Sequence, residues 1–244
     1  MIDQELVPAR DVSEPEPELK LPELNLPELD LPELRRRYLA AQLAGNRREA
    51  LRLLLDEGLA RGASVLDMQL DVIQAAQREI GRLWQENSIS IAQEHMATAI
   101  SSMALSHLFD RAPRAAANGK RVLVACVEGE LHDFPARMVA DALDLAGFEV
   151  RYLGASVPTD SLLQMIARDE PDLLALSTTM TFNVPALRQA LERVRAQTGG
   201  RFPIVIGGGA CSWVKNVVED LAVDGTASDA AETVRVISRL LGLP

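Results

Sequence analysis

Short apolar runs alternate with amphipathic stretches in the second half of this chain, and this alternation constrains the fold more than any other feature. The runs are RVLVACV, FEVRYLG, DLLALST and PIVIGG, with a weaker fifth run near AVDGTA. The amphipathic stretches begin near Phe134, Thr159, Val184 and Cys211, and a last one begins near Asp229. Apolar strands that alternate with helices predict an α/β fold with a five-stranded, doubly wound parallel sheet over residues 121–244.

The first half of the chain has a helical pattern, which we assign to residues 34–111. Two short helices come first, and two longer helices follow. Ser64 with Asp67, and Ser90 with Gln93, have the spacing of capping boxes and predict where the longer helices begin. One face of the third helix carries the apolar residues Leu66, Leu70, Ile73, Ile80 and Trp84. Four helices with short connections predict a helical bundle.

Residues 1–33 differ from the rest in composition. The segment KLPELNLPELDLPEL repeats the pattern xLPEL, and its regularly spaced prolines forbid a continuous helix. Because its acidic residues prevent the burial of a core, we expect a disordered tether. The repeated leucine pairs leave a second interpretation open, in which the segment folds on a protein partner. A further linker is expected at residues 112–120, between the bundle and the sheet.

Composition excludes several classes of partner. The formal net charge is −10, from 35 acidic and 25 basic residues, which argues against a phosphate-binding surface and therefore against direct nucleic-acid binding. The two cysteines, Cys126 and Cys211, are far apart and show no metal-binding spacing, which is typical of a reducing compartment. We find neither a signal-peptide pattern nor an apolar run of membrane-spanning length, so we expect a cytoplasmic protein without membrane contact.

The carboxyl edge of the predicted sheet is the expected ligand site, as in other flavodoxin- and Rossmann-like sheets. Glu130, His132, Ser177 and the glycines at 207–209 all follow strand ends. A phosphoacceptor receiver domain requires an aspartate after the third strand, where this chain has Ser177. A dinucleotide site requires G-x-G-x-x-G after the first strand, where EGELHDF contains a single glycine. Neither of these two sites matches the sequence.

The residues at this edge resemble the signature of cobalamin-binding domains, which consists of D/E-x-H-x-x-G, then S-x-L, then a double glycine. The matching residues are Glu130 and His132, then Ser177, then Gly207 and Gly208. Two positions depart from the signature. Pro135 replaces its glycine and is tolerated in the first turn of a helix, whereas Thr179 replaces its leucine and alters the pocket expected for the cofactor's nucleotide tail.

The resemblance implies a lower cobalt ligand from the protein, because the cofactor's own base swings away in this family. His132 would be that ligand, and Glu130 would hydrogen-bond its other ring nitrogen and fix the tautomer. For a lone histidine, an exposed loop position is the alternative. The residues expected to contact the lower side of the cofactor are Glu130, Leu131, His132, Asp133, Phe134, Ser177, Thr178, Thr179, Gly207, Gly208 and Gly209.

A helical bundle before such a domain resembles the cap that covers the upper ligand of cobalt. Trp84, Glu94 and His95 match the W-x9-E-H pattern of light-sensing adenosylcobalamin regulators of the CarH type. In that family the tryptophan packs on the adenosyl group and the Glu-His pair lines its pocket. The alternatives are a core position for Trp84 and a solvated helix start for the pair. Gln85 replaces the histidine that captures cobalt after illumination in the DNA-binding members.

Over residues 34–244 the resemblance implies a cobalamin-binding protein that is not itself an enzyme. We interpret the chain as a light-responsive sensor or transcription regulator, similar to stand-alone AerR-type regulators. Its expected partner is another protein, such as a transcription factor, or a second copy of itself. Adenosylcobalamin is the expected cofactor, with hydroxocobalamin and methylcobalamin as alternatives. The second interpretation is a corrinoid carrier of a methyltransferase system. A mutase subunit is less favoured, since the chain contains no substrate barrel.

Overall fold

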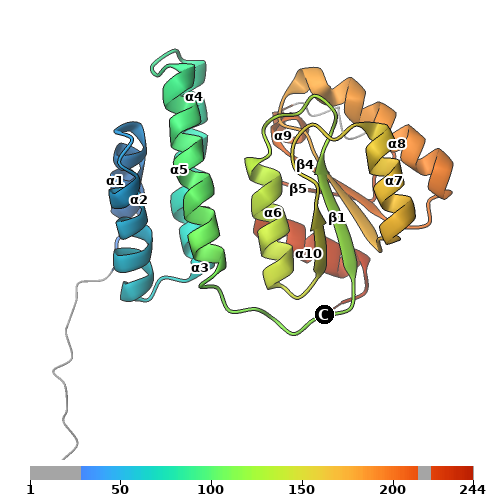
Figure 1. Cartoon of the computed structure of the whole chain (residues 1–244), viewed down its shortest axis with the longest axis horizontal. Helices are drawn as coiled ribbons and strands as arrows, with labels where there is room; N and C mark the ends of the chain where they lie inside the picture. Colours follow the sequence, from blue (N-terminus) through green and yellow to red (C-terminus); the bar gives the residue numbers. More distant parts are fainter. Residues whose placement is uncertain (1–28, 214–220, 244) are drawn as a thin grey trace, which may run out of the picture.

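The computed structural model of this protein describes residues 29–213 and 221–243, and every structural statement below refers to this part of the chain. A helical region comes first, and a parallel sheet with helices on both faces follows it (Figure 1). The fold class predicted from the sequence is therefore confirmed. Residues 1–28 lie outside the described part, so the disordered or docking character of the acidic LPEL segment stays a prediction.

Four helical rods form the first region. Its elements are α1 (Leu31–Leu43), α2 (Arg47–Arg52), η1 (Leu53–Gly58), η2 (Leu59–Arg61), α3 (Val65–Asp67), η3 (Met68–Gln74), α4 (Ala75–Gln85) and α5 (Ile91–Phe109). η1 and η3 are π-helical and η2 is a 3-10 turn, and each continues directly from the element before it. Residues 47–61 and 65–85 are therefore single rods. No helix in the described ranges is both long enough and apolar enough to cross a membrane.

The two longer rods begin at the predicted capping boxes. Ser64 Oγ accepts from the Asp67 amide at 3.0 Å, and the Asp67 carboxylate accepts from the Ser64 amide at 2.8 Å. Ser90 and Gln93 make the same reciprocal pair, with distances of 3.3 and 2.9 Å. Each box satisfies amides at the start of a helix that have no partner within that helix. Local sequence therefore decides where these helices begin.

α1 begins at Leu31, three residues earlier than the sequence predicts. Asp30 is its N-cap, and the Asp30 side chain accepts from the Glu33 amide at 3.1 Å. Pro32 lies in the first turn, where the missing N–H of proline has no helical partner to lose. The sequence predicts a disordered segment up to residue 33, but residues 31–33 belong to α1, because Pro32 follows a capping aspartate and fits the first turn of the helix.

The apolar stripe predicted on the third rod is only partly buried. Ile73 and Ile80 are fully buried, whereas Leu66 is 45% exposed. Leu66 precedes the π-helical segment η3, and a π turn closes its hydrogen bonds five residues apart instead of four. The wider turn rotates the residues before it relative to those after it. The prediction for Leu66 is therefore wrong, because it assumed one uninterrupted α-helical period.

The second region is a five-stranded sheet in the order β2-β1-β3-β4-β5, with all strands parallel. The strands are β1 (Arg121–Cys126), β2 (Glu149–Tyr152), β3 (Leu173–Ser177), β4 (Ile204–Gly207) and β5 (Gly225–Ala227). The helices are α6 (Phe134–Leu145), α7 (Thr159–Asp169), η4 (Thr181–Asn183), α8 (Val184–Thr198), α9 (Gly209–Trp213) and α10 (Ala230–Leu240). The chain reverses its direction of winding between β1 and β3, and this switch point is where ligands bind in doubly wound sheets.

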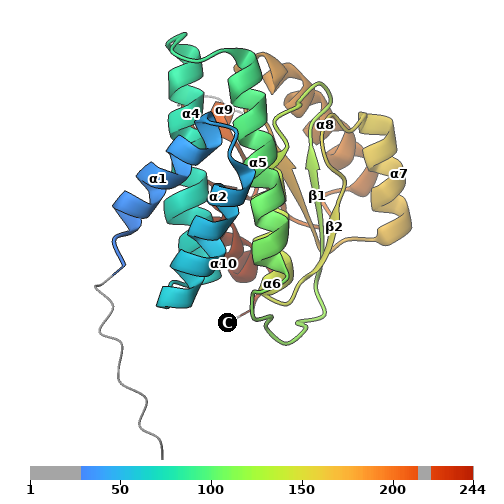
Figure 2. The ribbon, with the colours of Figure 1, turned by 60° about the vertical axis from the view of Figure 1, so that its left-hand side comes forward.

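Each face of the sheet has its own apolar core. α7 and α8 pack on one face, and α6 and α10 pack on the other. The bundle lies against the second of these faces, because Phe134, Met138 and Ala142 of α6 and Ala230 of α10 share a core with the bundle helices. α5 runs beside α6 in both views (Figures 1 and 2). The turn between α4 and α5 and the carboxyl ends of the strands both lie at the top of Figure 1.

Candidate functional site

A buried carboxylate links the loops that follow β1 and β3. Glu130 is fully buried, yet its two oxygens accept five hydrogen bonds. Oε1 accepts from the backbone amide of His132 at 2.9 Å and from His132 Nδ1 at 2.6 Å. Oε2 accepts from the amides of Thr179 and Met180 at 2.8 and 2.9 Å and from Asn183 Nδ2 at 3.0 Å. These bonds connect the ends of two neighbouring strands across the switch point.

The five donors keep Glu130 ionised. Burial alone would raise the pKa of this carboxyl, but the hydrogen bonds from His132, Met180 and Asn183 outweigh it and lower the pKa to about 2. A charged side chain without exposure is tolerated only when its lone pairs are satisfied in this way. Glu130 is therefore a fixed negative charge directly beneath His132.

The imidazole of His132 is oriented by this carboxylate. Because Nδ1 donates to Glu130, the network assigns the proton to Nδ1 and leaves the lone pair on Nε2, on the side of the ring away from the carboxylate. The side chain is 47% exposed. The hydrogen bond that His132 donates to Glu130 raises the pKa of His132, partial burial opposes that rise, and the charges of Glu130 and Glu94 add to it. A neutral, oriented imidazole with one free nitrogen is a metal ligand.

The loop that carries His132 is itself held by the loop after β2. The Gly129 amide donates to Ser156 Oγ at 3.0 Å, and the Ser156 amide donates to the Glu130 carbonyl at 2.8 Å. Two large apolar side chains lie beside this edge and are exposed, Leu131 at 73% and Phe182 at 69%. They belong to the segments that follow β1 and β3, so an apolar ligand bound at this edge would be able to cover them.

Close backbone packing explains the double glycine after β4. Gly208 has a φ of +100°, and a Cβ on it would lie 2.3 Å from the Thr178 carbonyl oxygen. A Cβ on Gly207 would lie 3.1 Å from the Ala227 carbonyl oxygen. The resemblance explains these glycines by the close approach of the backbone to the cofactor's nucleotide tail. Residue 208 must be glycine even without a cofactor, because a side chain there would clash with the backbone of Thr178. Gly209 is the first residue of α9.

Polar groups without partners lie at the end of β3. Ser177 is almost fully buried, next to the Cys126 thiol. The hydroxyl oxygens of Thr178 and Thr179 are buried and have no hydrogen-bond partner among the described residues. Buried hydroxyls without partners are rare in proteins, and a bound ligand can satisfy them.

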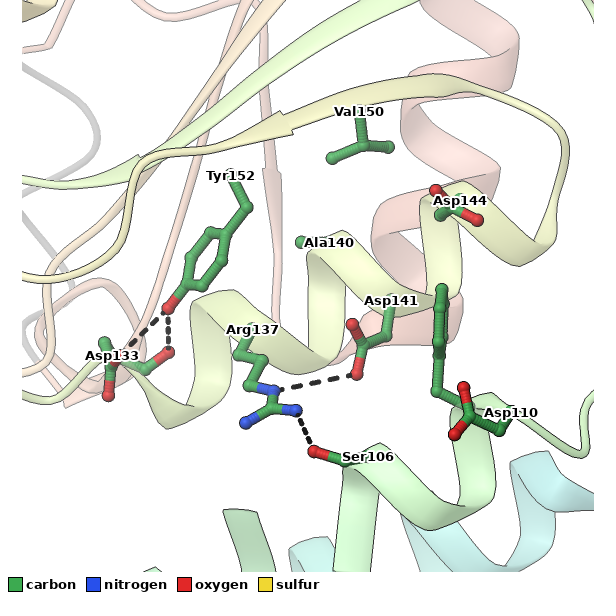
Figure 3. Close-up of a pocket in the computed structure, with 10 residues that line it drawn as sticks. Ser106, Asp110, Asp133, Arg137, Ala140, Asp141, Asp144, Val150 and Tyr152 are labelled. Atoms are coloured by element: carbon green, nitrogen blue, oxygen red, sulfur yellow. Dashed lines mark hydrogen bonds and ion pairs between the residues drawn. The ribbon is translucent and has the colours of Figure 1, made fainter. Parts of the chain in front are cut away.

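Two further residues predicted for the lower site, Asp133 and Phe134, contact other parts of the protein. Phe134 is buried in the core shared by α6 and the bundle. The Asp133 carboxylate accepts from Tyr152 Oη at 3.1 Å, and the Asp133 carbonyl accepts from the same hydroxyl at 3.2 Å (Figure 3). Neither side chain bonds to Glu130 or His132 in the described part of the chain, and their assignment as cofactor contacts stays a prediction.

Asp133 instead lines a pocket of about 480 Å³ between α5, α6 and β2 (Figure 3). The lining residues are Ser106, Phe109, Asp110, Asp133, Arg137, Ala140, Asp141, Asp144, Val150 and Tyr152. Arg137 Nη2 donates to Ser106 Oγ at 2.6 Å, which joins the sheet domain to the bundle. Burial raises the pKa of Asp141 to about 6, although Arg137 opposes the rise. The pocket therefore marks the contact between the two regions.

The upper candidate residues lie at the end of the bundle that faces the sheet edge. Trp84 is half-buried near the end of α4, and Glu94 and His95 lie in the first turn of α5. A Glu94 oxygen contacts His95 Nδ1, and the other Glu94 oxygen accepts from Thr98 Oγ1 at 2.9 Å. His95 is 72% exposed. The turn between α4 and α5, beside which these residues lie, is on the same side of the molecule as the carboxyl ends of the strands (Figure 1).

Sequence reasoning missed Asn183. This residue directly precedes α8, where an asparagine is expected to cap the helix. Its side chain makes no capping bond and donates to Glu130 instead. No motif in the sequence marks this role, because the partner is far away along the chain and close only in the folded sheet.

Comparison with known proteins agrees with this geometry. Residues 120–235 match the B12 binding domain family, and residues 34–109 match a second family that is also described as a B12 binding domain. The chain belongs to the B12-binding domain proteins. Its ligand is therefore a cobalamin, and both the helical region and the sheet of this B12-binding protein are parts of the match.

Relatives of the B12-binding protein fall into two groups. Dimethylamine corrinoid protein 1 of Methanosarcina acetivorans is 26% identical over 171 residues, which cover 69% of this chain and 80% of the relative. The HTH-type transcriptional repressor CarH of Myxococcus xanthus is 28% identical over 145 residues, which cover 59% of this chain and 48% of the repressor. The structure of the Methanosarcina barkeri monomethylamine corrinoid protein superposes with a TM-score of 0.78 at 22% identity, covering 86% of this chain and 99% of that one. This likeness shows the shared fold.

Proposed function

We propose that this B12-binding protein is a sensor that holds adenosylcobalamin between the bundle and the carboxyl edge of the sheet. When bound, the cofactor supplies a cobalt–carbon bond that light can break. The observation that carries the proposal is the position of the Glu94-His95 pair at the start of α5 and of Trp84 near the end of α4, on the same side of the molecule as the carboxyl ends of the strands. A protein partner or a second copy of the chain would respond to the upper ligand.

The lower residues fit a corrinoid. His132 would ligate cobalt through Nε2, because Nδ1 is committed to Glu130. Leu131 and Phe182 would cover apolar edges of the corrin. The hydroxyls of Thr178 and Thr179, which have no partner within the described residues, would hydrogen-bond the nucleotide tail. These roles use groups that the folded protein leaves exposed or unpaired.

The upper residues fit an upper ligand larger than a methyl group. Trp84 would stack on the adenine, because an indole side chain packs well on a flat base. The Glu94 carboxylate would accept hydrogen bonds from ribose hydroxyls, and the exposed His95 would lie beside it. A methyl group offers no hydrogen bonds and needs none of these side chains.

The second candidate function is a corrinoid carrier in a methyltransferase system. The match to the dimethylamine corrinoid protein favours it, because 80% of that relative is covered and only 48% of the repressor is. A carrier would use the same His132 and Glu130. The lower site therefore supports both functions, and only the upper ligand separates them.

Two measurements on the purified chain test the proposal. In the dark, equilibrium titrations compare adenosylcobalamin with methylcobalamin, and a sensor binds the adenosyl form more tightly. Green light is then applied to the adenosyl-loaded protein, and a sensor changes its elution volume in size-exclusion chromatography. Protein loaded with hydroxocobalamin and given the same light is the control. Equal or tighter binding of methylcobalamin, with an unchanged elution volume, would instead support the carrier.

A further inference from the structure

We infer that Thr98, Gln77 and Gln42 are positioning residues for Glu94, and that this hydrogen-bonded chain through the bundle sets which upper ligand the protein accepts. The inference rests on the proposed function, because it requires Glu94 to belong to the upper-ligand pocket. It assigns a role to side chains that contact neither the lower site nor the sheet.

The chain of hydrogen bonds crosses three helices. Gln42 on α1 donates through Nε2 to Gln77 Oε1 on α4 at 3.1 Å. Gln77 Nε2 donates to Thr98 Oγ1 on α5 at 2.8 Å. Thr98 Oγ1 donates to Glu94 Oε1 at 2.9 Å. One carboxylate oxygen of Glu94 is thus tied to the interior of the bundle, while the other contacts His95.

The direction of each bond follows from the carboxylate at the end. An ionised carboxylate only accepts, so the Thr98 hydroxyl must donate to Glu94 and use its lone pair to accept from Gln77. Gln77 then offers its NH₂ group to Thr98, which leaves its oxygen for the NH₂ group of Gln42. Along the route from Gln42 through Gln77 and Thr98, each group therefore donates to the next one toward Glu94. A chain with one direction ends on one orientation of the carboxylate.

The far end of the chain is anchored in the core. Gln42 Nε2 also lies 2.7 Å from Ser101 Oγ and 3.0 Å from the Ala97 carbonyl oxygen, and the Ser101 hydroxyl lies 3.1 Å from Tyr38 Oη. Tyr38, Gln42 and Ser101 have no exposed surface. Because tight packing fixes the rotamers of these three side chains, Gln42 is held in one position at the start of the hydrogen-bonded chain.

One atom of this network remains unpaired. Gln42 Oε1 is buried and has no hydrogen-bond partner among the residues that the structure describes. A buried acceptor without a donor is unfavourable for folding, so stability alone does not account for glutamine here. Orientation of Glu94 through Gln77 and Thr98 does account for it.

The test removes one link without changing shape. Thr98→Val keeps the branched side chain and deletes the hydroxyl, so Glu94 loses its donor. We expect the preference for adenosylcobalamin over hydroxocobalamin to fall about tenfold, the change expected when one hydrogen bond to a charged group is lost. Affinity for hydroxocobalamin should stay within about twofold, since His132 is untouched. Thr98→Ser retains the hydroxyl and should keep the wild-type preference for adenosylcobalamin.

Controls separate this inference from the proposed function. Glu94→Gln removes the carboxylate charge directly, and Thr198→Val makes the same change on α8, where the hydroxyl bonds only its own helix. Loss of preference in both Glu94→Gln and Thr98→Val supports the inference. Loss in Glu94→Gln alone overturns it and leaves the proposed adenosyl pocket intact. No loss in Glu94→Gln overturns the pocket itself and the inference with it. Gln77→Met is the second variant if Thr98→Val does not fold.

Discussion

The lower and upper sides of the candidate site are built in different ways. Below, Glu130 is fully buried and holds five N–H donors from the loops after β1 and β3. Above, the Glu94 carboxylate has one hydroxyl donor, Thr98, and its neighbour His95 is 72% exposed. The lower side is assembled before any ligand arrives, whereas the upper side is open. We infer that the lower side provides affinity for any corrinoid and the upper side selects the axial ligand.

This difference follows from the elements that carry each side. Carboxyl ends of parallel strands converge at one edge, so the lower residues are brought together from positions about 50 apart along the chain. The upper pair occupies one turn of α5 and depends on the helices behind it for orientation. Substitutions on each side, and at the contact between the two regions, should therefore have different effects.

Replacement of His132 by alanine should have the largest effect. The variant loses the imidazole whose Nε2 would ligate cobalt, so we expect affinity for hydroxocobalamin to fall at least about 100-fold. Absorbance titration measures the affinity and shows whether an imidazole ligates cobalt. His107→Ala, an exposed histidine on the far half of α5, is the control. Wild-type affinity and spectrum in His132→Ala would exclude His132 as the ligand.

Glu130→Gln should have the second largest effect. The glutamine NH₂ group would face N–H donors, so we expect cobalamin affinity to fall about 10- to 100-fold. Stability should respond as well. The pKa of Glu130 is about 2 in the folded protein and about 4.3 in an unfolded chain, so its stabilising contribution is complete above pH 4.3 and is lost as the pH falls toward 2.

Urea unfolding at several pH values between 7 and 3 measures this contribution. The wild type should lose free energy of unfolding on acidification, and Glu130→Gln should show a smaller loss. Glu149→Gln, at an exposed carboxylate paired with Arg151, is the matched control and should follow the wild type. An identical acid profile for wild type and Glu130→Gln would contradict the preassembled lower side.

Trp84→Ala should affect the upper side alone. Stacking of a base on an aromatic side chain contributes about 1–3 kcal/mol, so the preference for adenosylcobalamin over hydroxocobalamin should fall about tenfold. Hydroxocobalamin affinity is the internal control, since that form carries no adenine. A parallel loss of affinity for both forms would show that Trp84 is a core residue of the bundle and not a ligand contact.

Asp141→Asn should have the smallest effect, at the contact between the two regions. The pKa of Asp141 is raised to about 6, above the unfolded value of about 3.9, so its ionisation lowers stability as the pH rises from 4 to 6. The asparagine variant cannot ionise and should be about 1–2 kcal/mol more stable at pH 7.5. Thermal unfolding at pH 5 and 7.5 checks this, with exposed Asp160→Asn as control. If Asp141→Asn is instead less stable than the wild type at pH 7.5, the ion pair between Asp141 and Arg137 stabilises the fold by more than the burial of the charge destabilises it.

Most of the fold follows from local patterns. The strand–helix alternation predicts all five strands, and the capping boxes at Ser64 and Ser90 mark two helix starts, because each signal is contained in a few consecutive residues. Two features differ from the prediction, the start of α1 and the exposure of Leu66, and each has a local cause. Asp30 turns a proline repeat into a helix start, and the π-helical η3 rotates Leu66 out of the apolar stripe.

The candidate site was predictable only where a short motif carries it. Glu130 and His132 are two residues apart, and their spacing already indicates a carboxylate–imidazole pair. Asn183 was not predictable, because its approach to Glu130 depends on the adjacency of β1 and β3. The network behind Glu94 was hidden for the same reason, since Gln42, Gln77 and Thr98 belong to three separate helices.

Most helices and strands, the parallel sheet and the family of ligand could be predicted without coordinates, because these depend on periodicity and on residues close together in the chain. Tertiary structure decided which groups surround each carboxylate, which hydroxyls remain unpaired and why residue 208 must be glycine. Those properties depend on distances between distant segments, and such distances exist only once the hydrophobic cores have brought the bundle and the strand ends together.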